Sequence, residues 1–292
     1  MNRAEFRVAM ARPATRILTA PLALDPMSAA LAKQVGFEVV YVGGGGLGYQ
    51  RAVSEALLTA SEVADAARAI AEQVDVGVVI DGTTGFGDAV HTWRTVRMME
   101  QTGAFAVELE DQLAPKRAHH QKGIDHIIPV TEMAGKIAAA VEARTDPDFL
   151  IIARTNAISH DGVEDALARL AVYAEAGADL LLALPRDLEE LEAIADGTEL
   201  PLVAMLPVGR PDADLHRLGV ALKLDAFSAT LHGYRAIRRG YEDLLAGEEM
   251  VDSIPAALAE LAPLGTAMQI ERLWEIEART TERATPVGDG AE

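Results

Sequence analysis

The 292-residue chain contains no cysteine, so disulfides, thiolate metal sites and any cysteine nucleophile or acid are excluded. Aromatic residues are also few, with six Phe, two Trp and five Tyr. Half of the residues are nevertheless hydrophobic, and most of these are Ala, Val, Leu and Ile. We therefore expect a sizeable aliphatic core that needs no cross-links.

Positive charge and long apolar runs are scarce too. The 26 basic and 45 acidic residues give a net charge of −19, which argues against nucleic-acid binding because phosphate neutralisation requires a basic face. No stretch approaches the roughly 20 consecutive apolar residues of a membrane helix. Residues 1–13 lack the apolar run of a secretory signal. These absences predict a soluble cytoplasmic protein with no membrane partner.

Short apolar runs recur along the chain, and three of them are preceded by a helical segment that ends in glycine. Gly36, Gly103 and Gly177 stand where a left-handed C-cap residue is expected. The runs are continuous rather than alternating, which is typical of parallel strands covered by helices on both faces. We predict eight strands, at about 16–24, 38–42, 77–81, 104–110, 148–153, 179–184, 201–205 and 225–230. This alternation predicts an α/β fold, a (β/α)8 barrel, with a doubly wound open sheet as the alternative.

Capping signals and composition divide the chain further. Thr59 and Glu62 have capping-box spacing before a helix at 63–73, and residues 161–164 lead into a helix at 165–176. We expect a barrel over 1–246, a C-terminal helical segment over 247–279 and a disordered tail over 280–292. A helical stretch at 253–279 has too many apolar positions for a detached tail, so it should need a partner surface.

Polar residues at the ends of three consecutive strands are the first candidates for chemistry. Asp81, Glu110 and Arg154 end the third, fourth and fifth predicted strands, and ligand sites in parallel α/β folds lie where strands end. Two carboxylates beside a guanidinium suggest a divalent-metal site next to an anion clamp. Strand periodicity places Glu108 on the same face as Glu110. The alternatives are a turn cap at Asp81 and a structural salt bridge between Glu110 and Arg154.

A basic loop follows the fourth strand. This lid loop, residues 111–123, contains Lys116, Arg117, His119 and His120 within a strongly acidic protein. Its local positive charge would attract an anionic substrate, and loops of this kind often act as lids. A solvated surface loop is the alternative.

The chain resembles the phosphoenolpyruvate mutase/isocitrate lyase superfamily from about Arg16 to Arg279, and most of all its methylisocitrate lyase-like branch. The motifs that carry this resemblance lie at 81–87, 110–112, 116–120 and 153–157. The resemblance implies an α/β barrel whose last helix swaps onto a neighbouring subunit, usually in a homotetramer of paired dimers. It also implies Mg2+, with Mn2+ as the alternative cation, which binds a 2-oxo or 2-hydroxy carboxylate.

The resemblance also implies roles for individual residues. Asp81 and Glu110 match metal-site carboxylates, and Arg154 matches the arginine that binds the substrate carboxylate. Asp81 would touch the substrate as well. The segment of Tyr41, Gly43 and Gly44 corresponds to the strand end that contacts the oxo-carboxylate group, and the lid residues that match are Lys116, Arg117 and His120.

Several positions depart from the superfamily's pattern. Ala118 stands where the lyases have their catalytic cysteine, so His119 beside it is a candidate replacement acid, because imidazole titrates near neutral pH. Ser54 and Thr83 replace carboxylates of the metal site.

Two further departures make part of the site apolar. The sixth and seventh strands end at Leu184 and Met205, where the lyases have polar residues. A substrate with one carboxylate and an apolar or alkyl tail would fit such a site better than a tricarboxylate.

The leading hypothesis is a Mg2+-dependent lyase that cleaves a carbon–carbon bond in a 2-hydroxy acid and releases a 2-oxo acid. The metal would act as a Lewis acid, Tyr41 or a metal-linked water as the base, and His119 or His120 as the acid. A 2-oxo acid decarboxylase or hydrolase is the second hypothesis, since neither needs the cysteine. The third is a non-catalytic barrel that has lost metal ligands.

Overall fold

The computed structural model describes residues 1–11, 16–206, 212–248, 251 and 253–282. The predicted tail beyond residue 282 lies outside these residues. Contacts divide the chain into two compact units, Met1–Arg235 and Ala236–Glu292, with the boundary inside one helix. The first unit contains the predicted strand ends, and the second contains the C-terminal helices.

Within the described residues, eight parallel strands form one sheet in the order β1-β8-β7-β6-β5-β4-β3-β2. The strands are β1 (Leu18–Pro21), β2 (Val39–Val42), β3 (Gly77–Asp81), β4 (Ala106–Glu110), β5 (Leu150–Thr155), β6 (Leu180–Ala183), β7 (Leu202–Leu206) and β8 (Val220–Asp225). The two edge strands meet at a parallel bridge between Leu22 and Tyr41, where the Ala23 amide donates to the Tyr41 carbonyl at 2.9 Å. The sheet is therefore a nearly closed barrel, as predicted, and not an open doubly wound sheet.

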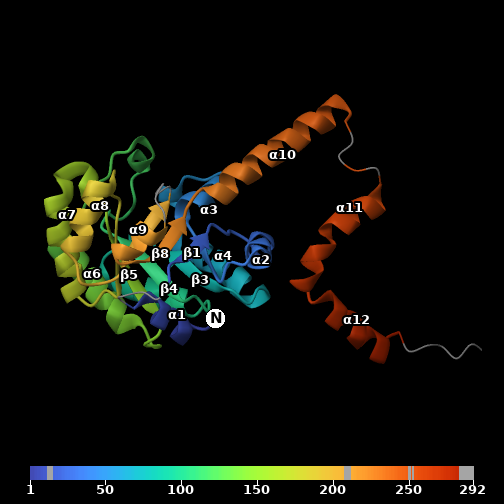
Figure 1. Ribbon diagram of the computed structural model, residues 1–292, viewed down its shortest axis with the longest axis horizontal. Helices are drawn as coiled ribbons and strands as arrows, with labels where there is room; N and C mark the ends of the chain where they lie inside the picture. The colour runs from blue at the N-terminus through green and yellow to red at the C-terminus, as the bar shows by residue number, and fades with distance from the viewer. Residues whose placement is uncertain (12–15, 207–211, 249–250, 252, 283–292) are drawn as a thin grey trace, which may run out of the picture. The chain divides into compact units, whose positions relative to one another are not determined.

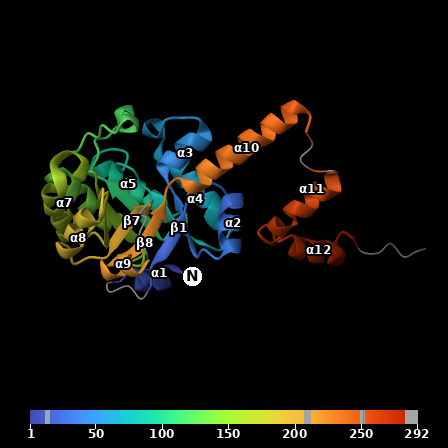
Figure 2. The same ribbon diagram turned by 45° about the horizontal axis from the view of Figure 1, so that its top comes forward.

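Helices surround this barrel. In the first unit they are α1 (Arg3–Met10), α2 (Pro26–Val35), α3 (Gly44–Arg51), η1 (Glu55–Leu57), α4 (Ala60–Gln73), α5 (Ala89–Glu100), η2 (Ala118–Lys122), α6 (Val130–Ala143), α7 (Ile158–Glu175), α8 (Leu188–Asp196) and α9 (Asp212–Arg217). Figure 1 shows the strands inside this ring, with α2 and α4 on one side and α6, α7 and α8 on the other. The turned view of Figure 2 shows α7, α8 and α9 outside β7 and β8. Strands covered in this way must be apolar on both faces, which explains their unbroken runs.

Local signals account for many of the helix ends. Thr59 accepts from the Glu62 amide, and the Glu62 carboxylate accepts from the Thr59 amide, so the capping box that starts α4 is confirmed. Gly36, Gly103 and Gly177 all have positive φ, as predicted for residues that end helices.

One expectation about boundaries was wrong. The eighth strand occupies Val220–Asp225 rather than 225–230, because Ser228 already starts the next helix. Helix α7 as a whole begins at Ile158, earlier than the helix expected at 165–176, but Gly162, with a φ of +83°, forms a kink that separates two helical segments. The capping signal around Asp161 therefore lies where the second segment, which contains the expected helix, starts.

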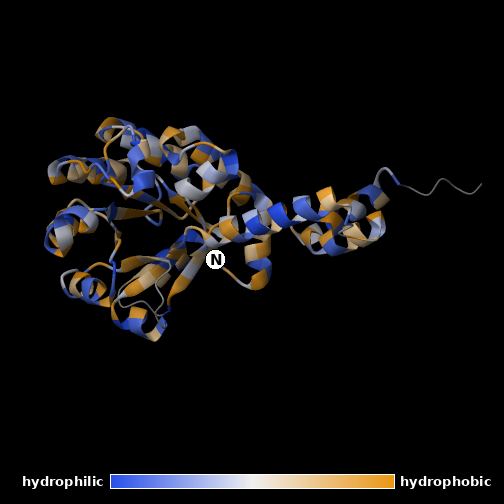
Figure 3. Ribbon diagram, turned by 90° about the horizontal axis from the view of Figure 1, so that it is seen from above, coloured by the Kyte–Doolittle hydropathy of each residue, from blue (hydrophilic) through white to orange (hydrophobic). Residues whose placement is uncertain are grey.

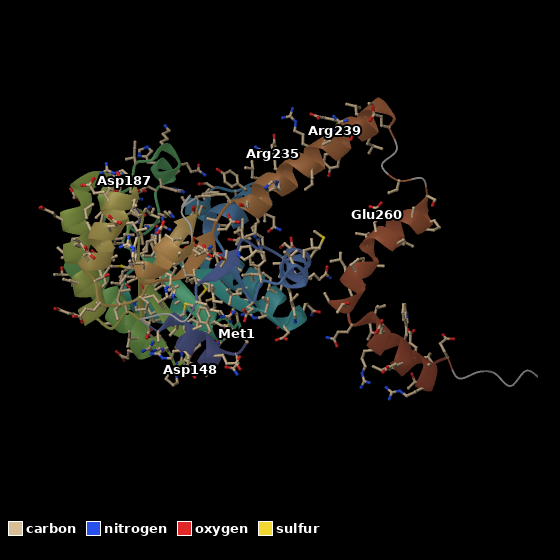
Figure 4. All side chains as sticks on the ribbon, viewed as in Figure 1. Met1, Asp148, Asp187, Arg235, Arg239 and Glu260 are labelled. Carbon is tan, nitrogen blue, oxygen red and sulfur yellow. The ribbon has the colours of Figure 1, made fainter. Side chains whose placement is uncertain are left out.

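The core lies inside the barrel and extends to one of its ends. In Figure 3 the strands are mainly hydrophobic, whereas the surrounding helices carry both hydrophobic and hydrophilic residues. Phe6 and Met10 of α1 belong to the same buried cluster as the strand residues. In Figure 4, Asp148 just before β5 and Asp187 just after β6 mark opposite ends of the barrel, and Met1 lies at the Asp148 end. Helix α1 thus covers the end at which the strands start, and the opposite end remains for a ligand.

The second unit consists of helices. α10 (Ser228–Ala246) crosses the boundary between the units, and α11 (Ile254–Leu261), η3 (Ala262–Thr266) and α12 (Ile270–Arg279) follow it. The helical stretch predicted at 253–279 is therefore present but interrupted, because Pro263 and the left-handed Gln269 break its hydrogen-bonding pattern. None of the described helices is long and apolar enough to span a membrane.

Candidate active site

The polar strand ends face one another across the parallel register. Asp81 of β3 pairs with Glu108 of β4, and Glu110 of β4 pairs with Arg154 of β5. All three carboxylates are buried. Glu108 and Glu110 both contact Arg154, so the prediction that they share a face is confirmed. A set of neighbouring strand ends therefore does bring these charges together at one end of the barrel.

Arg154 is the cation at the centre of this group. Its Nη1 donates to Glu108 Oε1 at 2.8 Å, and its Nη2 lies 3.6 Å from Glu110 Oε2. Nε and Nη2 both donate to Asn156 Oδ1, at 3.2 and 2.9 Å. A guanidinium has five N–H donors, and these three hydrogen bonds use only part of them. Arg154 is therefore held in place and still has donors for an anion.

Asp81 differs from the other strand-end carboxylates because it has no ion pair among the described residues. Its oxygens accept from the backbone amides of Gly44, at 2.9 Å, and Thr83, at 2.8 Å. Burial and the nearby charges of Glu108 and Glu55 raise the pKa of Asp81 to about 7. When ionised, Asp81 therefore carries a negative charge that has no ion-pair partner among the described residues.

Tyr41 extends the group on the other side of Glu108. Its hydroxyl donates to Glu108 Oε2 at 3.0 Å, and the side chain is fully buried in the barrel core. Burial and the charges of Asp81 and Glu108 raise the pKa of Tyr41 well above its usual value. Tyr41 is therefore protonated near neutral pH, with its proton directed at a carboxylate.

Gly43 and Gly44 leave no room for side chains at the end of β2. A Cβ at Gly43 would lie 2.8 Å from the Tyr41 ring, and a Cβ at Gly44 would lie 3.1 Å from Asp81 Oδ2. Their backbones can therefore approach the two site residues more closely than any other residue type would allow. This close approach accounts for glycines at this strand end.

The lid loop reaches the same group through Lys116. The Lys116 ammonium forms ion pairs with Glu110 and Glu55, and it lies 2.7 Å from Glu110 Oε1. The geometry of the Glu110 contact does not meet hydrogen-bond criteria, so Glu110 Oε1 is left without a hydrogen-bond donor. Although burial opposes it, the charges of Glu110 and Glu55 raise the pKa of Lys116. Lys116 thus joins a buried strand end to a residue that the sequence did not single out.

Glu55 is that missed residue. It begins η1, directly after Ser54, the position where the sequence pattern suggested a lost carboxylate. Its Oε2 lies 3.2 Å from His120 Nε2, and His120 Nδ1 contacts the Arg117 carbonyl at 2.9 Å. Although burial opposes it, the hydrogen bond from His120 and the charge of Lys116 lower the pKa of Glu55 to about 2. Glu55 therefore supplies a negative charge one residue after Ser54, where the superfamily's pattern has a carboxylate.

The other lid residues lie differently. Arg117 is exposed, and in the contacts described above it takes part only through its backbone carbonyl. His119 is also exposed, with its ring 6.0 Å from that of His126. Of the two adjacent histidines, His120 is the one that contacts a site residue in the structure.

A second set of missed residues supports the strand ends from behind. Asn156 Nδ2 donates to Glu110 Oε2 at 3.1 Å, and the Asn156 amide donates to Asp111 Oδ1 at 3.0 Å. Asp111 also accepts from Thr155, at 2.7 Å, and from Tyr173, at 2.9 Å. Strand alternation predicts that Asp111 leaves the face of Glu110, but its partners could not be named from the sequence.

Comparison with known proteins agrees with this geometry. Residues 8–245 match the model of the phosphoenolpyruvate phosphomutase family, which is well over half of the chain. The chain belongs to the phosphoenolpyruvate mutase/isocitrate lyase superfamily. The resemblance read from the strand-end motifs is thereby confirmed.

Relatives within the superfamily differ in their named activities. The 2,3-dimethylmalate lyase of Eubacterium barkeri is 39% identical over 216 residues, which cover 70% of this chain and 73% of that protein. An oxaloacetate decarboxylase of Pseudomonas fluorescens is 39% identical over 226 residues, with 75% and 76% covered. Among solved structures, phosphonopyruvate hydrolase in complex with oxalate and Mg2+ has a TM-score of 0.84 and 31% identity, and the match covers 97% of this chain and all of that one.

The residues present fit the divalent cation that the superfamily implies. Four carboxylates are gathered with two cations, so with Asp81 ionised the group has a surplus of two negative charges, or of one when His120 is protonated. The carboxylates are those of Glu55, Asp81, Glu108 and Glu110, and the cations are Lys116 and Arg154. No three Asp, Glu or His side chains of the described residues form a ready-made cage. Mg2+ needs none, since it is usually held by one or two carboxylates with water and substrate completing the shell.

Proposed function

We propose that this superfamily member is a Mg2+-dependent enzyme that cleaves a carbon–carbon bond in a 2-hydroxy carboxylic acid and releases a 2-oxo acid. The observation that carries the proposal is the carboxylate of Asp81, which has no ion-pair partner among the described residues and lies buried beside Glu108 of β4, the strand that separates it from Arg154 of β5. A cation next to Asp81 and an anion on Arg154 would complete this arrangement.

Mg2+ would be held by Asp81, with Glu110 as the second carboxylate, and Mn2+ could take the same place. When bound, the cation supplies Lewis-acid stabilisation of negative charge on the substrate oxygen. Glu110 is already engaged with Lys116 and Asn156, so Asp81 is the more available direct ligand.

Arg154 would bind the substrate carboxylate with the N–H donors that Glu108 and Asn156 leave unused. The close backbone approach at Gly43 and Gly44 would place the oxygen-bearing carbon of the substrate next to Tyr41 and Asp81. Positioning of this kind can contribute a large part of the rate enhancement.

Tyr41 would take the proton of the substrate hydroxyl while passing its own proton to Glu108. The O–H electrons then form the new carbonyl of the 2-oxo acid, and the electrons of the broken carbon–carbon bond remain on the leaving carbon. That carbon receives its proton from the lid, where His120 is better placed than His119 because it contacts Glu55. Lys116 and Arg117 would add positive charge over the bound anion.

The remaining wall of the site supports an alkyl-bearing substrate. Leu184, directly after β6, and Met205, the penultimate residue of the neighbouring strand β7, pack against the apolar core of the barrel. Neither can bind a second or third carboxylate. We therefore propose a substrate with one carboxylate at Arg154 and an apolar group toward these residues.

Decarboxylation or hydrolysis of a 2-oxo acid is the second candidate. It is favoured by Ala118, which offers no acid at the cysteine position of the lyases, and such a reaction uses the same enolate stabilisation without that acid. The likeness to an oxaloacetate decarboxylase is as high as the likeness to a dimethylmalate lyase.

We also propose that the C-terminal helices pack on another copy of the chain, in a tetramer built by helix swapping. α11 and α12 carry exposed apolar side chains, among them Leu258, Leu261, Leu273, Trp274 and Ile276. Light scattering on the full chain, and on a chain ending at residue 252, tests this: the full chain should be a tetramer and the shortened one should not.

The activity is tested by incubating the protein with a panel of 2-hydroxy and 2-oxo acids, with Mg2+ or with a chelator. Release of pyruvate or glyoxylate from an alkyl-bearing 2-hydroxy acid supports the lyase, and release of CO2 from a 2-oxo acid supports the decarboxylase. Absence of turnover together with unchanged Mg2+ binding in Asp81→Ala would support a non-catalytic barrel instead.

A further inference from the structure

Glu55 receives two basic side chains of the lid loop on one carboxylate. Lys116 bonds to Oε1 and His120 to Oε2, so the two oxygens are used by different residues. The side chain is only 12% exposed, and those of Lys116 and His120 are 8% and 14% exposed. These contacts therefore differ from surface ion pairs, which contribute little because water screens them.

The glycines that start α3 make the space that Glu55 occupies. A Cβ at Gly44 would lie 3.2 Å from Glu55 Cγ, and one at Gly45 would lie 3.4 Å from its Oε2. At Gly48 a Cβ would lie 2.8 Å from the Val53 carbonyl and 3.0 Å from the Glu55 amide. The backbone and the carboxylate of Glu55 thus rest directly on α3, which makes it a fixed partner for a loop.

The lid loop has few other attachments near its cationic residues. Its η2 turn is closed by bonds within the loop, from the His120 amide to the Arg117 carbonyl and from the Gly123 amide to the His120 carbonyl. No residue of η2 is buried. The contacts that join this part of the loop to the barrel are those of Lys116 with Glu55 and Glu110 and of His120 with Glu55.

We propose that Glu55 is a positioning residue that latches the lid loop over the site, holding Lys116 and His120 where the substrate must be bound and protonated. The catalytic part of this inference depends on the proposed function, whereas the latch itself does not. A carboxylate suits this task because it offers two acceptors. A glutamine would offer one acceptor and would direct its N–H groups at the second cation.

Loss of the Glu55 charge should remove some of the contacts between the lid loop and the barrel and leave others in place. Lys116 would retain Glu110, but His120 would lose its partner in the site. Removing one member of a buried ion pair costs more than the pair contributes, because the other charge is left unpaired. We therefore expect opening of the loop without unfolding of the barrel.

Hydrogen exchange measured by mass spectrometry on the whole protein without substrate tests the latch. Glu55→Gln should raise exchange in peptides covering 117–124 at least about tenfold, and Glu55→Asp, which retains the charge on a shorter side chain, should give an intermediate rise. Glu62→Gln is the matched control, since Glu62 caps the next helix without touching the loop, and it should leave the loop unchanged.

Unchanged exchange in Glu55→Gln, or an equal rise in Glu62→Gln, would overturn the latch. If Glu55→Gln does not fold, the same criteria apply to Glu55→Asp: unchanged exchange in that variant, or an equal rise in Glu62→Gln, would overturn the latch. With any substrate that the wild type turns over, kcat of Glu55→Gln should fall at least about tenfold with an unchanged thermal midpoint. A faster-exchanging loop in a protein that turns over no 2-hydroxy or 2-oxo acid would leave the latch standing and refute the proposed function.

Discussion

Asp81 and Glu108 are register partners on adjacent strands, yet only Glu108 meets a cation. Arg154 lies 2.8 Å from Glu108, whereas the oxygens of Asp81 are held by two backbone amides. Burial, together with repulsion from Glu108, raises the pKa of Asp81 to about 7. This arrangement supports the proposal that a cation binds beside Asp81 and an anion beside Arg154.

The two neighbouring histidines of the lid should differ in their effect on turnover. His120→Ala should lower kcat about 100-fold or more, the usual contribution of a positioned acid, because His120 contacts the site through Glu55. His119→Ala should change kcat less than about threefold, since His119 is exposed. Steady-state kinetics of both variants decide the matter. Abolished turnover in His119→Ala with unchanged ligand affinity would return the acid role to His119.

Arg154→Lys should weaken binding of a 2-oxo carboxylate although the charge is retained. A lysine cannot reproduce the planar guanidinium that contacts Glu108 and Asn156. The substitution therefore removes both the hydrogen bonds that hold the side chain in place and the N–H groups that would donate to the ligand. We expect the dissociation constant of pyruvate or oxalate to rise about tenfold or more. Calorimetry of this variant beside the exposed Arg186→Lys gives the comparison, and equal affinities would remove Arg154 from the site.

Leu184→Gln should change substrate preference. The value of kcat/KM should fall about tenfold or more for an acid with an alkyl tail, because an amide would replace apolar contact, and should change little for a short 2-oxo acid. Val35→Gln on exposed α2 is the control. An equal loss for long and short acids would mean that the tail lies elsewhere.

Arg3 should stabilise the barrel end opposite the site. It donates to the Ala104 and Glu100 carbonyls at 2.7 Å and to Asp146 at 2.8 Å. Arg3→Met should lower the free energy of unfolding by about 2 kcal/mol at neutral pH, measured by urea denaturation. A difference below about 0.5 kcal/mol would contradict the role.

The same contact predicts a pH dependence. The hydrogen bond from Arg3 lowers the pKa of Asp146, so this carboxylate contributes stability above its unfolded pKa and loses the contribution as pH falls through its lower folded pKa. The stability difference between wild type and Arg3→Met should therefore begin to shrink as pH falls below about 5, and the part due to Asp146 should be lost as pH falls through its folded pKa, which lies below the unfolded value of about 3.9. A difference that stays constant or grows toward acid would show that Asp146 is not involved.

Much of the site could be predicted because it lies at strand ends. Continuous apolar runs predict parallel strands, and parallel strands must bring Asp81, Glu110 and Arg154 to one end of the barrel. Glu55 could not be predicted in this way, since it lies in a short turn after α3 and meets Lys116 only through tertiary packing. The signal that could have found it is the glycine run at 43–46, which leaves space for a neighbouring side chain.

The first and last residues of some helices and strands were harder to predict than the polar residues at strand ends, because they also depend on tertiary packing. The eighth strand was expected five residues too late because the segment after Asp225 continues with Ala and Phe, which suit either structure. The signal around Gly162 indicated the start of the second segment of α7, but not the short segment from Ile158 that precedes the kink.

The role of Asp81 as a Mg2+ ligand is tested most directly by calorimetric titration of oxalate into the wild type and into Asp81→Asn, each with and without Mg2+, with the exposed Asp88→Asn as control. We expect the wild type and the control to bind oxalate only when Mg2+ is present. In Asp81→Asn the affinity should fall more than about 100-fold, a larger loss than the substitution of a residue outside the ligand shell causes. Oxalate binding that is equally strong without Mg2+, or equally strong in Asp81→Asn, would contradict this role.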